Sequence, residues 1–338
     1  MRTFTCSCGA RLFFENTRCL ACNSALGFRP DKLLLVTIPD AASSHEGNAF
    51  RLCTNYAENG VCNWLVPGDS PHTLCAACRL NHTIPNLSEP GNKTLWAEVE
   101  SAKRRLIYGL YRLRLEVLSK LDDPVRGLSF DIKSDVGDER VLTGHSDGLI
   151  TLNIEEAHPE KRERNRLALK ERYRTLLGHF RHEIGHYYWD RLVQEGARLE
   201  AFRKVFGDER DDYAQALERH YAAPLEDYRL RYISSYASSH PWEDFAETFA
   251  HYLHMRDTLE TAQHFGLVGH AQRAPTRDSS TLSALLDDWL GLTVALNALN
   301  RSMGLPDAYP FALTPLVEVK LAFVHELIAG RAAMRAVA

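Results

Sequence analysis

The sequence predicts an α+β protein in which a loop-rich, cysteine-rich segment precedes a mainly helical domain with a small sheet. All eight cysteines lie within the first 78 of 338 residues, in a stretch with many Asn, Gly and Pro residues. From Lys93 onward apolar residues recur at helical spacing, and three short strand-like runs follow the first helical pattern. We therefore expect two domains, residues 1–90 and residues 91–338, with SEPGN at the boundary.

The order of elements in the second domain follows from hydrophobic spacing and from turn and capping signals. A helical pattern over residues 94–118 ends before Asp122-Asp123-Pro124, which stops a helix. Candidate strands follow over residues 128–134, 140–144 and 148–154, separated by the turn-prone sequences VGDE and HSDG. Further helices are predicted over residues 158–194 (one long helix or two joined ones), 226–233 (short or irregular), 242–260 with Pro241 in the first turn, 283–303 and 315–334.

Charge and hydropathy narrow the classes of function. The chain is 45% hydrophobic and 25% charged, which is ordinary for a globular protein that buries a core. Its net charge of -4 gives no general attraction to nucleic acid or to an anionic membrane. No apolar run approaches the roughly 20 residues that span a bilayer, and the first residues lack the order of a secretion signal. We therefore expect a cytoplasmic protein with no membrane partner.

Cysteine spacing predicts metal sites rather than disulfides, because no export signal is seen. Two C-x2-C pairs have the spacing of zinc knuckles. The economical grouping gives two four-thiolate sites, with Cys6, Cys8, Cys19 and Cys22 in the first and Cys53, Cys62, Cys75 and Cys78 in the second. Such sites are structural, so we expect a double zinc-ribbon-like domain holding two Zn²⁺ ions, with iron as the alternative metal. The Cys6-x-Cys8 spacing is one residue shorter than usual, which strains the knuckle turn of the first site.

Two other interpretations of the cysteine-rich segment stay open. In one, the eight cysteines are free thiols, some of them buried as small apolar residues. In the other, the ribbon binds nucleic acid. The basic residues of the segment are scattered and form no stripe interleaved with aromatic side chains, so we prefer a structural or protein-docking role and expect no nucleic acid partner.

The sequence FRHEIGHYYW, residues 180–189, contains H-E-x-x-H within a predicted helix. Residues four apart share a helix face, so His182 and His186 are able to direct both imidazoles at one ion. Zinc lowers the pKa of a bound water toward about 7, and Glu183 lies where its carboxylate would take the proton. Because the pattern also occurs by chance in helical proteins, the interpretation requires a third ligand from a later element.

Glu243 is the candidate third ligand. Glu243 and Glu247 lie four apart in a helix that begins near Pro241, among aromatic residues and alanines where a solvated acidic face is unexpected. We expect Glu243 to bind the ion and Glu247 to accept a hydrogen bond from a ligating imidazole, which fixes the orientation of that ring. Alternatively, Glu243 only benefits from the positive end of the helix.

Four other polar residues near these motifs are weaker candidates. We interpret Asp190 as a surface residue, His251 and His254 as partly buried polar residues, and His179 as a weak alternative ligand.

H-E-x-x-H followed by Y-x6-E-x-F-A-E resembles the gluzincin-type zinc metallopeptidases of the lethal-factor kind. The resemblance implies a zincin-like fold, Glu243 as the third ligand and Tyr236 as the residue that stabilises the transition state. The edge strand that binds an extended peptide in such folds would be the run over residues 148–154.

Nearly the whole chain is similar to a bacterial family of zinc-binding metallopeptidases with an N-terminal zinc ribbon. The similarity includes FFENTRCLAC, CNWLVP, CRLNHTIPNLS, LLGHFRHEIGHYYW and HPWEDFAETFAHYLH.

Three functions of different classes compete. The first is a zinc-dependent peptidase acting on a protein or peptide substrate, with one catalytic and two structural Zn²⁺ ions. The second is a non-catalytic zinc-binding protein that regulates or docks a partner on a zincin-like fold. The third is a ribbon protein that binds DNA or RNA. A structural zinc site needs neither a carboxylate beside the ion nor a tyrosine facing it, so Glu183 and Tyr236 favour catalysis.

Overall fold

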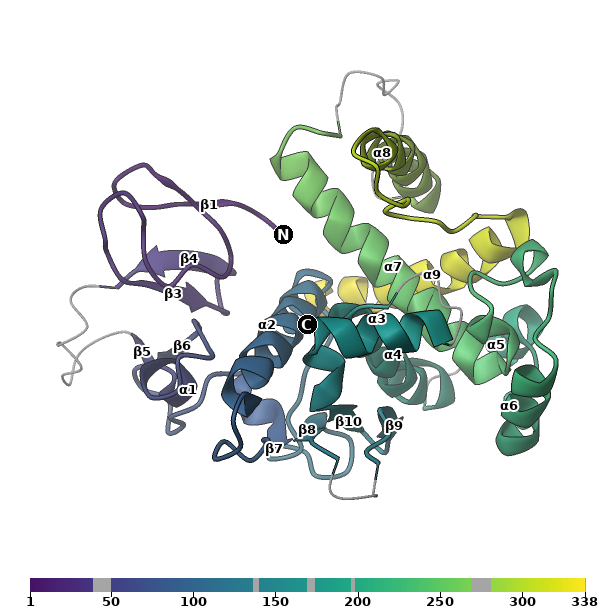
Figure 1. Ribbon diagram of the computed structural model, residues 1–338, viewed down its shortest axis with the longest axis horizontal. Coiled ribbons are helices and arrows are strands. Elements are labelled where there is room, and N and C mark those ends of the chain that lie inside the picture. Colours follow the sequence, from purple (N-terminus) through teal and green to yellow (C-terminus); the bar gives the residue numbers. More distant parts are fainter. Residues whose placement is uncertain (39–49, 136–139, 169–173, 196–197, 269–280, 338) are drawn as a thin grey trace. The chain divides into compact units, whose positions relative to one another are not determined.

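The computed structural model describes residues 1–38, 50–135, 140–168, 174–195, 198–268 and 281–337, and the chain divides into two compact units. The first unit consists mainly of Met1–Arg112 and Glu116–Asn165, and the second mainly of Arg181–Ala338. Helices predominate over strands in the described residues (Figure 1), which confirms a mixed, mostly helical protein with a small sheet.

Three antiparallel pairs of short strands build the first part of the first unit. The pairs are β1 (Phe4–Thr5) with β2 (Arg11–Leu12), β3 (Leu26–Arg29) with β4 (Leu34–Thr37), and β5 (Phe50–Leu52) with β6 (Leu65–Pro67), and the short helix α1 (Thr54–Ala57) follows β5. Their core is aromatic: Phe28 is fully buried, with ring centroids 5.0 Å from Phe14 and 5.0 Å from Trp64. Strands this short bury little apolar surface, so this cluster and the thiolates described below hold the segment together.

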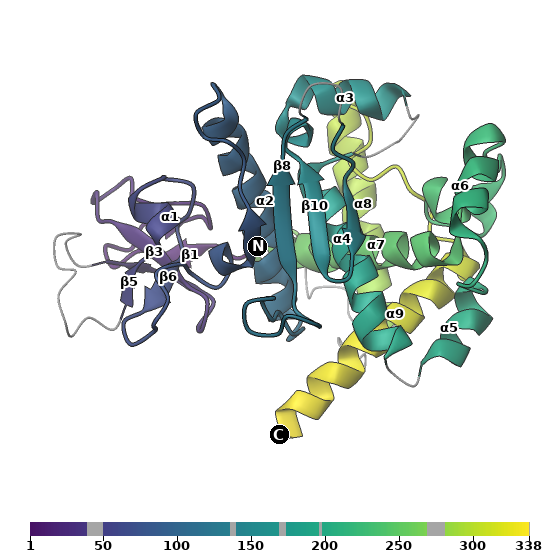
Figure 2. The same cartoon turned by 90° about the horizontal axis from the view of Figure 1, so that it is seen from below.

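Helix α2 (Asn92–Arg112) lies beside a four-stranded sheet in the same unit (Figure 2). The strand order is β7 (Asn81–Thr83), β8 (Ser129–Lys133), β10 (Leu149–Asn153) and β9 (Gly144–Ser146). β8 is parallel to both β7 and β10, whereas β9 is antiparallel to β10. The first predicted helix and the first and third predicted strands are confirmed, although α2 ends at Arg112, two residues before Arg114 takes a positive φ of 57°.

Two details of the sheet differ from the prediction. The third predicted strand is interior rather than an edge strand, because β9 pairs with β10 on the side away from β8. Only Gly144 of the second predicted strand belongs to the sheet. Upstream of it, the Val141 amide donates to Asp135 Oδ1 at 2.8 Å and the Val141 carbonyl accepts from Asn153 Nδ2 at 3.0 Å. These side chains occupy the backbone groups that a strand ladder would have used.

The remaining elements are helical. They are α3 (Pro159–Ala168), α4 (Leu176–Trp189), the π-helical continuation η3 (Asp190–Gln194), α5 (Leu199–Phe206), α6 (Tyr213–Ala222), α7 (Pro241–His264), α8 (Leu282–Ser302) and α9 (Pro315–Val337), with single turns η1 (Cys78–Leu80), η2 (Ile154–Ala157), η4 (Tyr228–Leu230) and η5 (Tyr236–Ser238). The helix predicted over residues 158–194 is therefore two helices, and residues 169–173 between them lie outside the described part of the chain.

Helix α7 is the central helix of the second unit and contacts α5, α8 and α9. Its first turn starts as predicted: Pro241 occupies the first helical position, and the side chain of the capping residue His240 accepts a hydrogen bond from the Trp242 amide at 3.1 Å. Farther along, Phe245 packs edge-on against Phe206 of α5, with ring centroids 5.6 Å apart. A capped start and a buried aromatic face therefore fix both the position and the rotation of α7.

Helix α8 corrects one expectation. Its 21 residues are long enough and apolar enough to cross a membrane by length and composition, so the prediction that no apolar run reaches this size is wrong. Only 33% of that window is buried inside the protein, and a single helix that passes by length and composition alone shows little about a membrane. The helix is therefore weak evidence for a membrane segment.

Candidate metal centres

The first four-cysteine group lies in the β1–β3 region. The structure brings the sulfurs of Cys6, Cys8, Cys19 and Cys22 within 4.8 Å of one another, with 3.6 Å between Cys6 and Cys22 and 3.7 Å between Cys8 and Cys19. Four sulfurs at about 2.3 Å from a tetrahedral zinc ion would lie about 3.8 Å apart, so the spacing fits the ion. Gly9 with a φ of +87° lets its amide donate to the Cys6 carbonyl at 2.9 Å, which accommodates the short C-x-C spacing.

The second four-cysteine group is buried. Cys53, Cys62, Cys75 and Cys78 are at most 2% exposed, and their sulfurs also lie within 4.8 Å of one another. The Cys62 and Cys75 sulfurs are 3.7 Å apart, again the spacing of a tetrahedral thiolate site. Backbone amides of Trp64 and Cys75 donate to the sulfurs of Cys62 and Cys53, each at 3.3 Å, and such donors favour the thiolate form.

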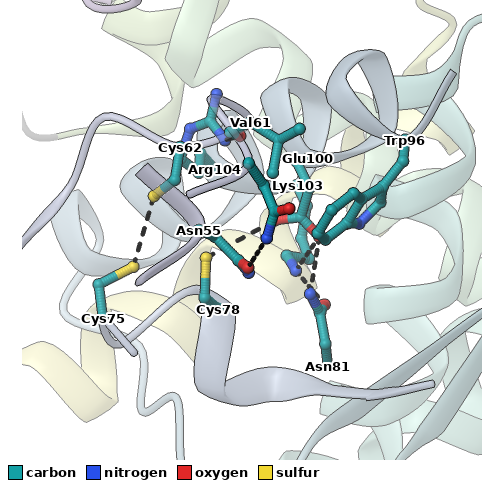
Figure 3. Close-up of polar contacts among 11 residues, drawn as sticks. Asn55, Val61, Cys62, Cys75, Cys78, Asn81, Trp96, Glu100, Lys103 and Arg104 are labelled. Atoms are coloured by element: carbon teal, nitrogen blue, oxygen red, sulfur yellow. Dashed lines mark hydrogen bonds and ion pairs between the residues drawn. The ribbon is translucent and has the colours of Figure 1, made fainter. Parts of the chain in front are cut away.

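A buried ion pair from α2 lies beside this second group (Figure 3). Glu100 and Lys103 are both 0% exposed, and Lys103 Nζ donates to Glu100 Oε1 at 2.7 Å. Asn81 and Trp96 donate to the same oxygen at 2.8 and 3.1 Å, while the other oxygen lies 4.0 Å from the Cys78 sulfur. The α2 helix therefore supplies a buried polar network, in which three donors converge on one oxygen of Glu100, beside the last cysteine of the second group.

The third group joins α4 and α7 in the second unit. His182 and His186 come from successive turns of α4, and Glu243 from the first turn of α7. Glu243 Oε2 lies 2.9 Å from His182 Nε2 and 3.4 Å from His186 Nε2, and the two imidazole nitrogens are 3.1 Å apart. Nitrogen and oxygen ligands at about 2.0–2.1 Å around a tetrahedral zinc ion would lie about 3.3 Å apart. The three side chains proposed as ligands therefore converge on one point.

A glycine allows the two helices to approach each other at this point. Gly185 lies between the two histidines on α4, and a Cβ added there would meet the Cα of Ala246 on α7 at 2.9 Å. Ala246 belongs to the same run of residues as Glu243 and Glu247. The absence of a side chain at Gly185 thus sets the distance between the helix that carries the histidines and the helix that carries the glutamates.

Glu247 contacts the far side of one imidazole, as expected. His182 Nδ1 donates to Glu247 Oε1 at 2.7 Å, which leaves Nε2 facing Glu243. Burial alone would lower the pKa of His182, but hydrogen bonds to Glu243 and Glu247 raise it well above its usual value. Burial opposes ionisation of Glu247 too, yet the hydrogen bond from His182 lowers the pKa of Glu247 to about 2.

Glu183 and Tyr236 lie near the same group. Glu183 is 8% exposed, and burial raises the pKa of its carboxyl although His182 and His186 oppose the shift. Tyr236 is half-buried in the turn η5, with its ring centroid 5.8 Å from that of His182. Burial and the charge of Glu243 raise the pKa of Tyr236, so the phenol keeps its proton.

Sequence analysis missed two further neighbours of the ligand group. The Tyr213 hydroxyl donates to Glu243 Oε1 at 2.7 Å, and the Trp242 ring lies 3.8 Å from that of His186, tilted by 39°. Tyr213 lies thirty residues before Glu243, and nothing in its local sequence indicates the contact. Trp242 adjoins Glu243 in the sequence, and that adjacency is the one local signal of its contact with His186.

The weaker candidates do not belong to the three described groups of potential metal ligands. His179 Nδ1 lies 3.6 Å from Glu156 Oε2, and His251 Nδ1 lies 2.8 Å from the Tyr309 hydroxyl. His254 packs edge-on against the rings of Trp289 and Tyr309. Asp190 starts η3, where α4 changes to π-helical winding.

Comparisons with known proteins agree with these groups. Residues 92–327 match the model of a family described as "Putative zinc-binding metallo-peptidase", and residues 3–89 match one described as a zinc-ribbon domain. Uncharacterized proteins of Mycobacterium bovis and of two strains of Mycobacterium tuberculosis are similar to the chain, each 44% identical over 333 residues, which is 97% of this chain and 95% of the relative. No solved structure matches at a significant level.

Proposed function

The chain belongs to this family of zinc-binding metallo-peptidases and carries an N-terminal zinc-ribbon domain, and we propose that it is an active zinc peptidase of the gluzincin, lethal-factor-like type. Its zincin-like part would hydrolyse peptide bonds of a protein or peptide substrate. The observation that carries the proposal is the convergence of His182, His186 and Glu243 on one point, with Glu183 in the same turn of α4.

The donor set fits a zinc ion. Two imidazole nitrogens and one carboxylate oxygen are the ligands of many catalytic zinc sites, which keep one position open. Glu243 Oε2 is buried, and apart from its close contacts with Nε2 of His182 and of His186 it accepts no hydrogen bond from another group among the described residues, which supports its role as a cation ligand. A zinc ion bound there would polarise the substrate carbonyl and lower the pKa of water.

Each surrounding residue has a defined task in this proposal. Glu183 accepts the proton of the attacking water and passes it to the leaving amine. Tyr236, protonated at neutral pH, donates a hydrogen bond to the substrate oxygen as negative charge develops on it. Glu247 would hold the His182 ring in the tautomer whose unprotonated Nε2 is directed at the ion.

The test combines metal analysis with a proteolysis assay. We expect three zinc ions per wild-type chain, one for each described ligand group, and two in His182→Ala, because the ribbon groups keep theirs. The metal analysis should find zinc, not iron, in all three ligand groups. Glu183→Gln should keep three zinc ions but lose cleavage of a peptide library.

Each alternative outcome has a distinct meaning. Activity that survives Glu183→Gln would exclude that residue as the base. Three zinc ions with no cleavage by the wild type of any peptide or unfolded protein would favour the non-catalytic, regulatory alternative.

The location and the ribbon's role also stay proposals. We expect a cytoplasmic protein whose zinc ribbon braces the fold or docks a protein partner, without binding nucleic acid or membrane. Fractionation of cells and retention on nucleic acid at several salt concentrations would test these expectations.

A further inference from the structure

The two oxygens of the Glu243 carboxylate have different surroundings. Oε2 faces the imidazoles, 2.9 Å from His182 Nε2 and 3.4 Å from His186 Nε2. Oε1 faces α6 and accepts the Tyr213 hydroxyl at 2.7 Å. Glu243 is only 1% exposed, so neither oxygen faces bulk solvent.

The Tyr213 hydroxyl is held in place by anchored backbone. Tyr213 is the first residue of α6, whose capping residue Asp212 accepts from the Gln215 amide at 3.0 Å. The preceding carbonyl, that of Asp211, accepts from Nε2 of His240, the capping residue of α7, at 3.1 Å. The rings of Tyr213 and His240 also meet edge-on, with centroids 5.3 Å apart. The first turns of α6 and α7 are thus joined by several independent contacts.

The chain enters this junction through a close approach. Gly207 ends α5 with a φ of +106°, a conformation that L side chains rarely adopt. A Cβ added there would meet Cγ of Pro241, the first residue of α7, at 3.2 Å. The path from α5 to α6 is therefore fixed against the same turn of α7 that carries Glu243.

We propose that Tyr213 is a positioning residue that makes Glu243 a one-oxygen ligand. The hydroxyl engages Oε1, so Oε2 alone is left for the ion, and a second carboxylate oxygen does not compete for a coordination position. Catalytic zinc sites need such a vacant position, whereas structural sites are closed. This inference rests on the proposed function, because it assigns Tyr213 a task at a metal ion that the proposed function requires.

The test uses Tyr213→Phe, which removes only the hydroxyl, beside the matched control Tyr228→Phe. The Tyr228 hydroxyl lies 3.4 Å from Nε of its chain neighbour Arg229, in η4. A chelator removes the third metal while the ribbon groups keep theirs, and the emptied site is titrated with Zn²⁺ and, separately, with Co²⁺. We expect Tyr213→Phe to bind Zn²⁺ about 10–100-fold more weakly, the usual effect of losing a partner of a ligand, and Tyr228→Phe to bind as the wild type does.

The visible spectrum of the Co²⁺ form reports the coordination number directly. The Tyr213→Phe spectrum should weaken and shift toward that of a five-coordinate ion, because the freed Oε1 joins Oε2 at the metal. A spectrum and an affinity equal to those of the wild type would overturn the inference. So would a loss of turnover with both metal properties unchanged, because Tyr213 would then act on the substrate.

Two further results keep this inference separate from the proposed function. If wild-type protein holds only the two ribbon metals, the proposed function fails; if it holds three and Tyr213→Phe changes nothing, only the role of Tyr213 fails. Should Tyr213→Phe not fold, infrared difference spectra of the wild type with and without the third Zn²⁺ decide. Widely separated carboxylate stretches indicate a one-oxygen ligand, and closely spaced stretches of a two-oxygen ligand would refute the proposal.

Discussion

Gly185→Ala tests whether the close approach of α4 and α7 sets the geometry of the ligand group. The added Cβ would lie 2.9 Å from the Ala246 Cα and 3.1 Å from the Ala246 carbonyl oxygen. Ordinary carbon contacts are about 3.5–4.0 Å, so the helices must separate by roughly 0.6–1 Å. Both contacts are to backbone, which cannot move away as a side-chain end would.

The expected cost follows from two opposing terms. Overpacking of a core costs about 1–3 kcal/mol, while replacing Gly by Ala within a helix gains about 1 kcal/mol. We therefore expect a net loss of about 0–2 kcal/mol in the free energy of unfolding. The loss of zinc affinity at the third site should be more pronounced than the loss of stability. A displacement of about 0.6–1 Å exceeds the roughly 0.2 Å tolerance of metal–ligand distances.

The assay measures denaturant unfolding of protein that lacks only the third metal, and the Zn²⁺ affinity of the third site, with Gly291→Ala as the control. Gly291 lies on α8, and nothing would lie within 4 Å of its added Cβ, so this variant should gain up to about 1 kcal/mol and bind zinc normally. If Gly185→Ala gained stability like the control and kept wild-type zinc affinity, the account of helix spacing would be refuted.

Three further perturbations have defined outcomes. Lys103→Met leaves Glu100 buried without its cation and should lower the free energy of unfolding by about 3–5 kcal/mol. The control Lys161→Met removes a pair whose side chains are 51% and 31% exposed, and it should cost no more than about 1 kcal/mol. Equal losses would show that burial of the Glu100–Lys103 pair does not matter for stability. Glu247→Ala should weaken zinc binding at the third site about 10–100-fold in a competition titration, and wild-type affinity would show that the contact to His182 does not matter. Burial lowers the pKa of His251 to about 4, below its unfolded value of about 6.5, so the unfolded chain binds more protons between these pH values and acidification should destabilise the fold by about 3 kcal/mol. His251→Asn, which keeps a polar partner for Tyr309, should reduce that slope between pH 6.5 and 4 in stability measurements. The remainder would come from His254, whose pKa burial also lowers, and an unchanged slope would mean that His251 does not contribute.

Local signals predicted the elements, and spacing predicted the groups that the structure brings together. Pro241 and the apolar spacing after it predicted the start of α7, because capping chemistry is encoded within a few residues. The C-x2-C pairs predicted a zinc ribbon because two thiolates on one turn face one ion. Glu243 was found from its spacing to Glu247 and from its apolar surroundings.

What sequence analysis missed depended on tertiary contacts. The strand over residues 148–154 was predicted to be the edge strand because it is the last strand before the histidine helix, whereas the three-residue β9 pairs with it and makes it an interior strand. The approach of Tyr213 to Glu243 depends on how the chain turns at Gly207 and on how α6 docks, which no local pattern reports. Likewise, the sequence H-E-I-G-H identified His182 and His186 as ligands. It did not show that Gly185 allows the close approach of α7, because that contact depends on the tertiary structure.

The last ligand of the ribbon and the first strand of the sheet are almost contiguous in the chain: Cys78 opens η1, and β7 begins at Asn81, whose amide reaches Glu100. An expression clone that began near residue 91 would discard that strand. In such a fragment β8 would become an exposed edge strand with unpaired backbone groups, and Lys103 would lose its contact with the Asn81 side chain. Exposed edge strands promote aggregation, so we expect this fragment to be insoluble. Preparations of residues 91–338 should therefore keep the ribbon attached and include zinc during refolding.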